Sequence, residues 1–283
     1  MIVVKVKAGL GNQMFQYALG RRLSLDWQDK LKFDFSWFDE VRKGETPREI
    51  EIGAFNIVFD KANVSEVSSV KPNPIRKILE RINGRFNRNY FFTFHPHLLK
   101  RRKDILLDGY FQSYKYLNPI REKLLNDFVL KNGYGVEAEG LKKEIEESEQ
   151  SVAIHVRRGD YVTSCKDWNG LCSVDYYRKA IAEINKKHSN IKLFIFSDDI
   201  QWAKENFKFD VPMVFVSRPT LGAVEELLLM SLCKHQIIAN STFSWWSAWL
   251  NKNNEKIVIA PSRWLVASKI DTKDLIPSDW IRI

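Results

Sequence analysis

The side chains best suited to chemistry lie in one short segment, Ile154-His155-Val156-Arg157-Arg158-Gly159-Asp160-Tyr161, which follows an apolar run typical of a buried strand. A guanidinium group binds phosphate through paired, charge-assisted hydrogen bonds. Because neighbouring side chains of a strand point to opposite faces, Arg157 and Arg158 are expected to have different roles. One arginine would bind a diphosphate, and the other would pair with Asp160 to shape the turn. A purely structural Arg–Asp pair at a strand end is the alternative.

A glycine-containing turn, Gly9-Leu10-Gly11-Asn12-Gln13, follows the first predicted strand at residues 3–7 and precedes a helix predicted from residue 13. Glycine lets a backbone approach a ligand, and the N-terminus of a helix attracts anions. These properties make Gly11, Asn12 and Gln13 candidates for binding an anionic ligand. The segment has neither the full dinucleotide-binding glycine pattern nor the lysine of a phosphate-binding loop. A tight strand-to-helix turn without a ligand is an equal alternative.

Two acidic residues end another predicted strand, in Phe196-Ser197-Asp198-Asp199. They are adjacent rather than spaced as Asp-x-Asp, and no histidine or second carboxylate cluster lies near them in the sequence, so no metal site is predicted. A serine or carboxylate at a strand end is suited to bind the base or ribose of a nucleotide. The alternative for Asp198 and Asp199 is an N-cap of the helix that starts near Gln201.

A fourth polar segment, Asn240-Ser241-Thr242-Phe243-Ser244-Trp245-Trp246, again joins a predicted strand to a predicted helix. Small hydroxyl groups and free backbone N–H groups at a helix start bind phosphate. Helix capping by Ser241 or Thr242 explains part of this pattern but not all four polar residues. The three tryptophans from Trp245 to Trp249 recur at helical spacing and are predicted to be core residues rather than a platform for sugar stacking.

Alternating strands and helices are needed to position these segments. The elements predicted after residue 150 are strands 151–156, 192–196, 213–216, 236–239 and 256–260 and helices 174–188, 201–207, 222–234 and 243–251. Such an alternation forms a parallel sheet with both faces covered, and ligands bind at its carboxyl edge. The stretch 132–149, glycine-containing and then acidic, is the predicted junction between an N-terminal domain, 1–140, and a C-terminal domain, 150–283. The predicted fold class is α/β, with two Rossmann-like domains facing a cleft.

The composition excludes several classes of protein. Hydrophobic residues make up 45% of the 283 residues, enough for a sizeable core, and no apolar stretch is long enough to span a bilayer. Because Lys5 and Lys7 interrupt the first apolar run, we expect it to be neither a signal peptide nor a membrane anchor. The three cysteines form neither a disulfide framework nor a zinc pattern, which favours a reducing cytoplasm and no bound metal.

The net charge of +9 arises in one segment. Residues 71–103 contain ten Lys or Arg and one acidic residue, and the rest of the chain has 34 basic and 34 acidic residues. Apolar residues at helical spacing from Ile75 to Phe86 predict a basic amphipathic helix. Two interpretations are open for residues 75–103: peripheral contact with the anionic inner face of a membrane, or a basic face in solvent. Nucleic-acid binding is disfavoured, because no recognition module is present and this charge lies apart from the strand-end motifs.

The four motifs, in this order, resemble the α-1,2-fucosyltransferases of glycosyltransferase family 11. The resemblance covers most of the chain, through residues 9–17, 155–161, 196–199, 226–235, 241–246 and 276–280. Glu226 stands where many members of that family have Asp. The resemblance implies a GT-B type fold, with the acceptor on the side of residues 1–140 and GDP-fucose bound mostly by residues 150–283.

The resemblance also implies an activity and roles for residues. The activity is an inverting, metal-independent transfer of L-fucose from GDP-β-L-fucose, without a cofactor, to a galactoside-type oligosaccharide or lipid-linked glycan of a lipopolysaccharide or capsule. The residues implied to bind the donor are Gly11, Asn12, Gln13, His155, Arg157, Arg158, Asp160, Ser197, Asp198, Asp199, Glu226, Asn240, Ser241, Thr242, Phe243 and Ser244. Arg157, Arg158, Asn12 and Asp160 are the catalytic candidates, and no general base is identified. The alternatives are a transferase for another linkage or GDP-sugar, a non-catalytic nucleotide-sugar-binding module, and a basic nucleic-acid-binding protein.

Overall fold

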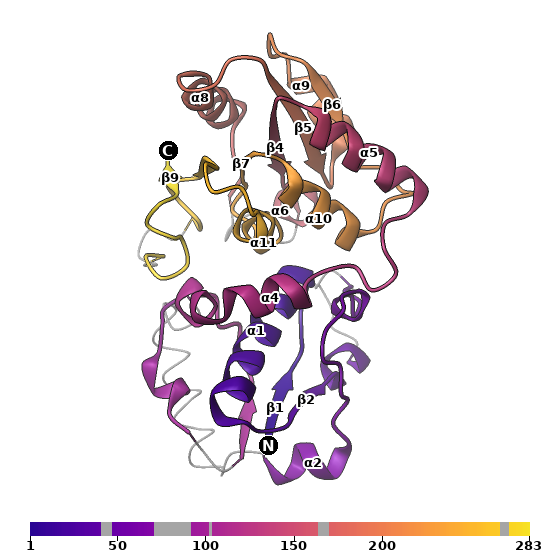
Figure 1. The fold of residues 1–283 in the computed structure, drawn as a ribbon, viewed down its shortest axis with the longest axis vertical. Helices are drawn as coiled ribbons and strands as arrows, with labels where there is room; N and C mark the ends of the chain where they lie inside the picture. Colours follow the sequence, from indigo (N-terminus) through magenta and orange to yellow (C-terminus); the bar gives the residue numbers. More distant parts are fainter. Residues whose placement is uncertain (41–46, 71–91, 102–103, 164–169, 267–271) are drawn as a thin grey trace. The chain divides into compact units, whose positions relative to one another are not determined.

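The chain forms two compact units, each with its own parallel sheet (Figure 1). The computed structural model describes residues 1–40, 47–70, 92–101, 104–163, 170–266 and 272–283. Unit 1 contains Met1–Val129 and Lys269–Pro277, and unit 2 contains Leu130–Ser268 and Ser278–Ile283. The predicted α/β class is confirmed. The division between the units falls before the predicted junction at 132–149.

Unit 1 is built on a three-stranded parallel sheet in the order β2-β1-β3. Its strands are β1 (Ile2–Lys5), β2 (Leu31–Asp34) and β3 (Ile105–Leu107). Strand alternation sends Val4 toward the helix α1 (Leu10–Trp27), whereas Val3 packs with Ala62 and Val70 in a separate cluster. The helix begins at Leu10, three residues before the predicted start, because the Gly9 carbonyl already accepts the Asn12 and Gln13 N–H groups.

A segment near the end of the chain, residues 272–277, belongs to unit 1. Leu275 and Ile276 are buried there. The Asp274 carboxylate accepts the Phe94 N–H at 2.8 Å and pairs with Lys115 at 2.5 Å. These contacts join residues far apart in the sequence, so the predicted domain ranges of 1–140 and 150–283 do not include this return.

Unit 2 is built on a six-stranded parallel sheet in the order β6-β5-β4-β7-β8-β9. Its strands are β4 (Gln150–Val156), β5 (Ile191–Ser197), β6 (Met213–Phe215), β7 (His235–Ile237), β8 (Val258–Ala260) and β9 (Ile281–Arg282). The five strands predicted after residue 150 are confirmed. The sixth, β9, was not predicted, because two exposed residues carry no periodic signal.

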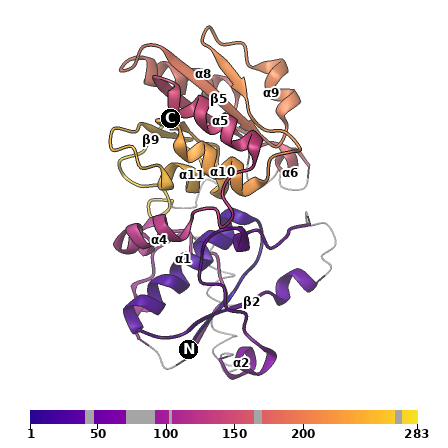
Figure 2. The ribbon, with the colours of Figure 1, turned by 45° about the vertical axis from the view of Figure 1, so that its right-hand side comes forward.

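Helices cover both faces of the unit 2 sheet (Figures 1 and 2). One face, which includes Ile154 and Ile195, packs against α8 (Val174–Asn185) and α9 (Ile200–Asn206). The other face, which includes Ala153, packs against α5, α10 and α11. These three helices are α5 (Val136–Glu147), α10 (Ala223–Leu232) and α11 (Thr242–Leu250). The side chains of the residues after β4 therefore point either toward the layer of α8 and α9 or toward the layer of α5, α10 and α11.

The acidic stretch of the predicted junction forms α5. Its buried residues are Ala138, Leu141 and Ile145, spaced at three and four residues, and they form one stripe in the unit 2 core. The stripe is narrow and lies among acidic residues, which is why the composition of the segment suggested a linker. The remaining α-helices are α2 (Val64–Ser69), α4 (Arg121–Asp127) and α6 (Gly159–Val162), and the short 3-10 helices are Ser36–Asp39, Ile52–Ala54, Pro96–Leu99, Tyr114–Tyr116 and Asn118–Ile120.

Most of the basic segment, residues 75–91 and 102–103, lies outside the described residues. Its predicted amphipathic helix and its contact with an anionic membrane therefore stay predictions. Within the described ranges, no helix has both the length and the apolar character needed to cross a bilayer.

We expect Gly20→Ala to destabilise unit 1. A Cβ atom at Gly20 would lie 2.6 Å from Val4 Cγ2 and 2.9 Å from a Leu31 methyl carbon, where α1 crosses the sheet. Overpacking of this kind costs about 1–3 kcal/mol. Chemical denaturation measures the loss. The matched control is Gly140→Ala in α5, where a Cβ atom would meet nothing within 4 Å and the better helix former should add about 0.5–1 kcal/mol. Equal effects of the two substitutions would contradict the packing described for α1.

Candidate functional site

Three of the predicted motifs meet at the carboxyl edge of the unit 2 sheet. β4 is the central strand of the three and pairs in parallel with β5 on one side and β7 on the other. Residues 157–160 follow β4, residues 197–199 begin with the last residue of β5, and residues 240–244 come after β7, so they lie at one edge of one sheet. Ligands of open parallel sheets bind at this edge.

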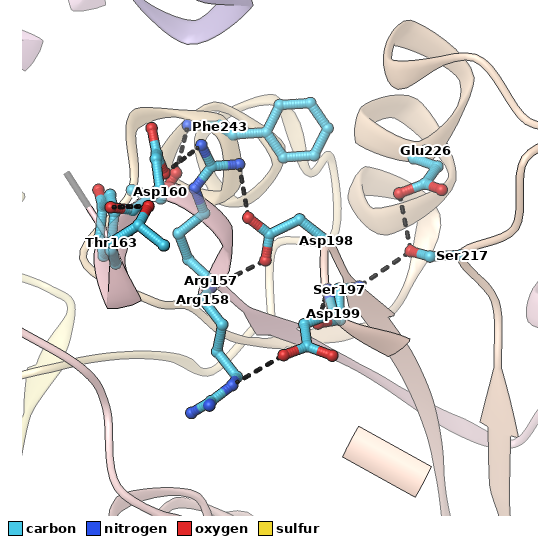
Figure 3. A network of polar contacts seen from close by, with 12 residues as sticks. Arg157, Arg158, Asp160, Thr163, Ser197, Asp198, Asp199, Ser217, Glu226 and Phe243 are labelled. Atoms are coloured by element: carbon cyan, nitrogen blue, oxygen red, sulfur yellow. Dashed lines mark hydrogen bonds and ion pairs between the residues drawn. The ribbon is translucent and has the colours of Figure 1, made fainter. Parts of the chain in front are cut away.

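Arg157 is held between two carboxylates (Figure 3). Its Nη2 donates to Asp160 at 2.8 Å, and its Nη1 lies 3.0 Å from Asp198. Burial by itself would lower the pKa of Arg157, but the negative charges of Asp198 and Asp160 outweigh burial and raise the pKa above its usual value. The guanidinium also lies 5.5 Å from the Tyr161 ring, whose hydroxyl donates to the Asn240 carbonyl. Arg157 is therefore a fixed cation on the side of the sheet where α11 begins.

Arg158 points to the opposite helix layer. Its Nε donates to Asp199 at 3.1 Å, and its guanidinium carbon lies 4.0 Å above the ring of Trp202 in α9. Asp199 also caps α9 by accepting the Trp202 N–H. The prediction that the two arginines point to opposite faces is confirmed. The Asp160 pair belongs to Arg157. The predicted division of roles would therefore leave the diphosphate to Arg158, but the Arg158 guanidinium lies over Trp202 in the α9 layer. The N-cap predicted as an alternative for the acidic pair belongs to Asp199.

Gly159 allows the two strand ends to approach each other. A Cβ atom at this position would lie 2.5 Å from the Asp198 carboxylate. That carboxylate accepts the Arg158 backbone N–H at 2.8 Å and pairs with the Arg157 side chain. A side chain at position 159 would therefore push away one of the two groups that hold Arg157.

His155 is a buried, neutral ring beside Arg157. Burial, together with the charge of Arg157, lowers the pKa of His155 to about 3. Its ring lies 5.5 Å from that of Phe243 in the first turn of α11. The Nδ1 atom is buried and has no hydrogen-bond partner among the described residues. The predicted residues His155, Arg157 and Phe243 therefore lie together on one side of the sheet.

Glu226 is connected to the strand ends through Ser217, which sequence reasoning missed. The Ser217 hydroxyl donates to Glu226 at 2.8 Å and accepts the Ser197 N–H at 2.9 Å (Figure 3). Burial raises the pKa of Glu226 to about 7, and the Ser217 hydrogen bond opposes this shift. Ser217 directly follows a predicted strand, so its position at a strand end was the available signal. The Ser197 hydroxyl accepts the Asp199 N–H and shapes the turn after β5.

At the start of α11, most polar side chains hold the backbone, and one hydroxyl, that of Thr242, does not. Ser241 caps the helix by accepting the Phe243 N–H, and the Ser244 hydroxyl donates to the Ala239 and Ser241 carbonyls. Asn240 is buried and donates to the Trp264 carbonyl. The Thr242 hydroxyl is half-buried and makes no hydrogen bond to a described residue.

The three tryptophans that follow the start of α11 are core residues, as predicted: Trp245 and Trp246 are fully buried, and Trp249 is 5% exposed.

The candidates after the first strand lie in unit 1. Gly11 is buried in the first turn of α1. The Gln13 amide makes four hydrogen bonds, donating to Ala8 and Glu49 carbonyls and accepting two N–H groups, from Glu51 and Ile52. Gln13 therefore holds the backbone of the unit. The Asn12 side chain is half-buried, and its oxygen accepts a hydrogen bond from Gln112 at 2.6 Å.

In the described part of the chain, histidine, cysteine, aspartate and glutamate side chains form no group of three or more that could hold a metal ion.

The family model for glycosyl transferase family 11 matches residues 91–283, about two thirds of the chain. The chain belongs to glycosyl transferase family 11. It is therefore a glycosyltransferase, as the motifs predicted.

Two relatives of this family 11 chain match it over nearly its full length, and a third matches half of it. The O-antigen biosynthesis glycosyltransferase WbnK of Escherichia coli is 33% identical and matches 98% of this chain and 99% of its own length. An alpha-1,2-colitosyltransferase of Escherichia coli is 32% identical, over 100% of this chain and 99% of its own. Galactoside alpha-(1,2)-fucosyltransferase 2 of Mus musculus is 29% identical over 50% of this chain and 43% of its own.

Solved structures support the fold of the family 11 chain. Fucosyltransferase NodZ from Bradyrhizobium superposes with a TM-score of 0.52 at 14% identity, over 87% of this chain and 92% of NodZ. The structure of NodZ alpha-1,6-fucosyltransferase from a crystal soaked with GDP-fucose superposes with a TM-score of 0.52 at 16% identity. The superposition covers 88% of this chain and 92% of NodZ. At this identity the similarity concerns the fold, and the predicted GT-B class is confirmed.

We expect the pH dependence of stability to report the burial of Glu226. Its pKa is about 7 in the folded chain and 4.5 ordinarily, so the folded state binds more protons between these values. The free energy of unfolding should therefore fall as pH rises from about 4.5 to about 7, by about 3 kcal/mol from this group. Urea denaturation at several pH values measures the free energy of unfolding and its change with pH.

Two substitutions test this assignment. Glu226→Gln should remove the decrease in the free energy of unfolding between these pH values. Ser217→Ala should extend the decrease to higher pH, because it removes the hydrogen bond that the Ser217 hydroxyl donates to the Glu226 carboxylate and that opposes the rise in its pKa. A Glu226→Gln chain with the original pH profile would contradict the assignment.

Proposed function

We propose that this family 11 chain is an inverting, metal-independent α-1,2-fucosyltransferase. It moves L-fucose from GDP-β-L-fucose to a 2-hydroxyl of a galactoside-type glycan. The observation that carries the proposal is Arg157, which is fixed by Asp160 and Asp198 at the carboxyl edge of the sheet, on the side of α11. The proposed linkage is that of two relatives, the alpha-1,2-colitosyltransferase and the mouse galactoside alpha-(1,2)-fucosyltransferase, and the proposed donor is the GDP-fucose with which the NodZ crystal was soaked.

The chemistry makes a fixed cation at this edge useful. The oxygen of the acceptor hydroxyl bonds to the anomeric carbon of β-linked fucose while the bond from that carbon to the diphosphate oxygen breaks, which gives an α-linkage. The hydroxyl proton is released to solvent. The electron pair of the broken bond stays on GDP, so most negative charge develops on the diphosphate. Fixed donors placed at developing charge supply the largest share of catalysis in many enzymes. Arg157 and the N–H groups at the start of α11 would provide those donors in place of a metal ion.

The carboxylates around Arg157 leave donors for a phosphate. A guanidinium has five N–H groups, and the two bonds to Asp160 and Asp198 occupy two of them. The carboxylates restrict the side chain to one rotamer, so less entropy is lost when a phosphate binds. Asp160 acts in this scheme by positioning Arg157 and not as the base that receives the acceptor proton.

Glu226 is suited to bind the guanine base. Guanine presents two adjacent donors, N1–H and the N2 amino group, which match the two oxygens of one carboxylate. Glu226 is on α10, the helix beside α11, and Ser217 already fixes one of its oxygens. A guanine would thus lie on the same side of the sheet as Arg157.

Transfer of colitose is the second candidate function. The alpha-1,2-colitosyltransferase matches the whole chain, whereas the mouse fucosyltransferase matches half of it. Colitose is fucose without its 3-hydroxyl group, so both sugars would be carried on the same GDP. The two donors therefore share the diphosphate and guanine contacts and differ only at the sugar.

We expect thermal-shift screening to identify the donor class. GDP and GDP-fucose at 100 times their Kd should stabilise the folded chain by about 2.7 kcal/mol, and UDP-sugars should not. EDTA should leave the shift unchanged, because the cation at the diphosphate belongs to the protein. Turnover of GDP-fucose compared with GDP-colitose decides between the two donors. A shift by UDP-sugars alone, or activity that EDTA abolishes, would contradict the proposal.

We expect Arg157→Ala to lower turnover of GDP-fucose by about 100- to 1000-fold, the usual effect of removing one group that stabilises developing charge. Arg157→Lys should not restore turnover, because a single ammonium cannot reproduce the guanidinium geometry. The control is Arg178→Ala, at an exposed position on α8, which should keep normal turnover. Melting curves for each variant report whether the fold is intact. Near-normal turnover in Arg157→Ala would contradict the assignment.

A further inference from the structure

Tyr161 contacts two segments of the unit 2 site that follow different strands. It belongs to α6, the single helical turn after β4. The centre of its ring lies 5.5 Å from the guanidinium carbon of Arg157, and its hydroxyl donates to the Asn240 carbonyl at 3.0 Å. Asn240 directly precedes Ser241, the N-cap of α11. One side chain therefore connects Arg157 to the start of α11.

The Asn240 end of this connection is anchored inside unit 2. Asn240 is 4% exposed. Its amide nitrogen donates to the Trp264 carbonyl at 3.1 Å and to the Gly170 carbonyl at 3.4 Å, and its side-chain oxygen accepts from the Cys172 thiol at 3.8 Å. These partners lie before α8 and after β8, so a shift of the backbone at Asn240 would break several contacts at once. The Asn240 carbonyl is therefore a fixed acceptor for the Tyr161 hydroxyl.

The Arg157 end is held by two carboxylates as well as by the ring (Figure 3). Asp160 is on the same helical turn as Tyr161, and Asp198 follows β5. An aromatic ring within about 6 Å of a guanidinium attracts the cation. Through Tyr161, the segment after β7 is thus added to the two segments whose carboxylates hold Arg157.

The separation between Arg157 and the start of α11 matters for the proposed reaction. Under the proposed function, the guanidinium and the N–H groups in the first turn of α11 bind the same diphosphate. These two groups of donors follow different strands, β4 and β7, whereas a diphosphate has a fixed size. A misplacement of about 1 Å is enough to slow a reaction strongly. The two groups of donors therefore need a rigid connection.

We infer that Tyr161 is a positioning residue, which fixes Arg157 relative to the start of α11 so that both bind one diphosphate. Tyr161 acts through Arg157 and does not itself contact the reacting atoms. The inference rests on the proposed function, which supplies the diphosphate. Loss of the hydroxyl would leave the ring beside Arg157 but release it from Asn240. The donors would then remain, without their fixed separation.

Nucleotide binding by Tyr161→Phe tests this role. We expect the Kd for GDP to rise about three- to tenfold, the effect of one lost hydrogen bond. Guanosine has no phosphate, so its Kd should stay within about twofold. The kcat with GDP-fucose should fall about three- to tenfold for the same reason. In an Arg157→Ala background the same substitution should change kcat by less than about twofold, because no guanidinium is left to position.

A matched control separates this role from general stabilisation of the fold. The Tyr176 hydroxyl, on α8, donates to the Ile238 carbonyl at 2.6 Å in the same unit. Tyr176→Phe also loses a bond from a tyrosine hydroxyl to a backbone carbonyl, so it should lower the melting temperature but leave kcat and the Kd for GDP unchanged. Equal weakening of GDP and guanosine binding in Tyr161→Phe, or unchanged GDP binding, would overturn the inference.

Nitrogen NMR of the arginine side chains, recorded without nucleotide, tests the positioning independently. In Tyr161→Phe the Arg157 signal should shift, and its N–H protons should exchange faster with water. The Arg158 signal is the internal control and should not change, because Asp199 and Trp202 hold that side chain. An unchanged Arg157 signal would overturn the inference. Failure of the unmodified chain to bind GDP would instead contradict the proposed function, and a changed Arg157 signal would support the positioning even then.

Discussion

The arrangement of the unit 2 site depends on keeping one half-buried guanidinium, that of Arg157, charged and fixed. Arg157 follows a central, buried strand, where an unpaired cation would be costly. Asp160 comes from the next helical turn and Asp198 from the neighbouring strand, so the cation is stabilised only when both segments are folded. Gly159 is needed for the same reason, because it lets Asp198 reach its position. The fold and the site therefore share one set of contacts.

The polar residues at the edges of the two sheets are of two kinds: some hydrogen-bond to the backbone of turns, and others keep donor groups that make no such bond. Asn240, Ser244 and Gln13 form hydrogen bonds with backbone carbonyl and N–H groups of turns. Arg157 and Asn12, in contrast, keep some donors after their structural contacts are made. Residues of the first kind explain why the turns have their shape. Under the proposed function, residues of the second kind are the ones that bind a ligand.

Much of the fold was predictable, because buried strands and amphipathic helices repeat at fixed periods that a sequence displays. The strand ends were also predictable, and with them the meeting of the motifs after β4, β5 and β7. The sequence could not predict that Asp160 pairs with Arg157 rather than with Arg158, because this pairing depends on which helix layer each arginine side chain faces.

Ser217 was missed for a related reason. It acts through Glu226, a partner on another element. The return of residues 272–277 to unit 1 likewise leaves no local signal.

A crystal structure of the chain with GDP would test the central claim most directly. The account predicts Arg157 nitrogens within hydrogen-bond distance, about 3 Å, of a β-phosphate oxygen, with Asp160 and Asp198 still holding the side chain. It also predicts guanine against Glu226. A nucleotide bound elsewhere, with Arg157 making only its two carboxylate contacts, would contradict it.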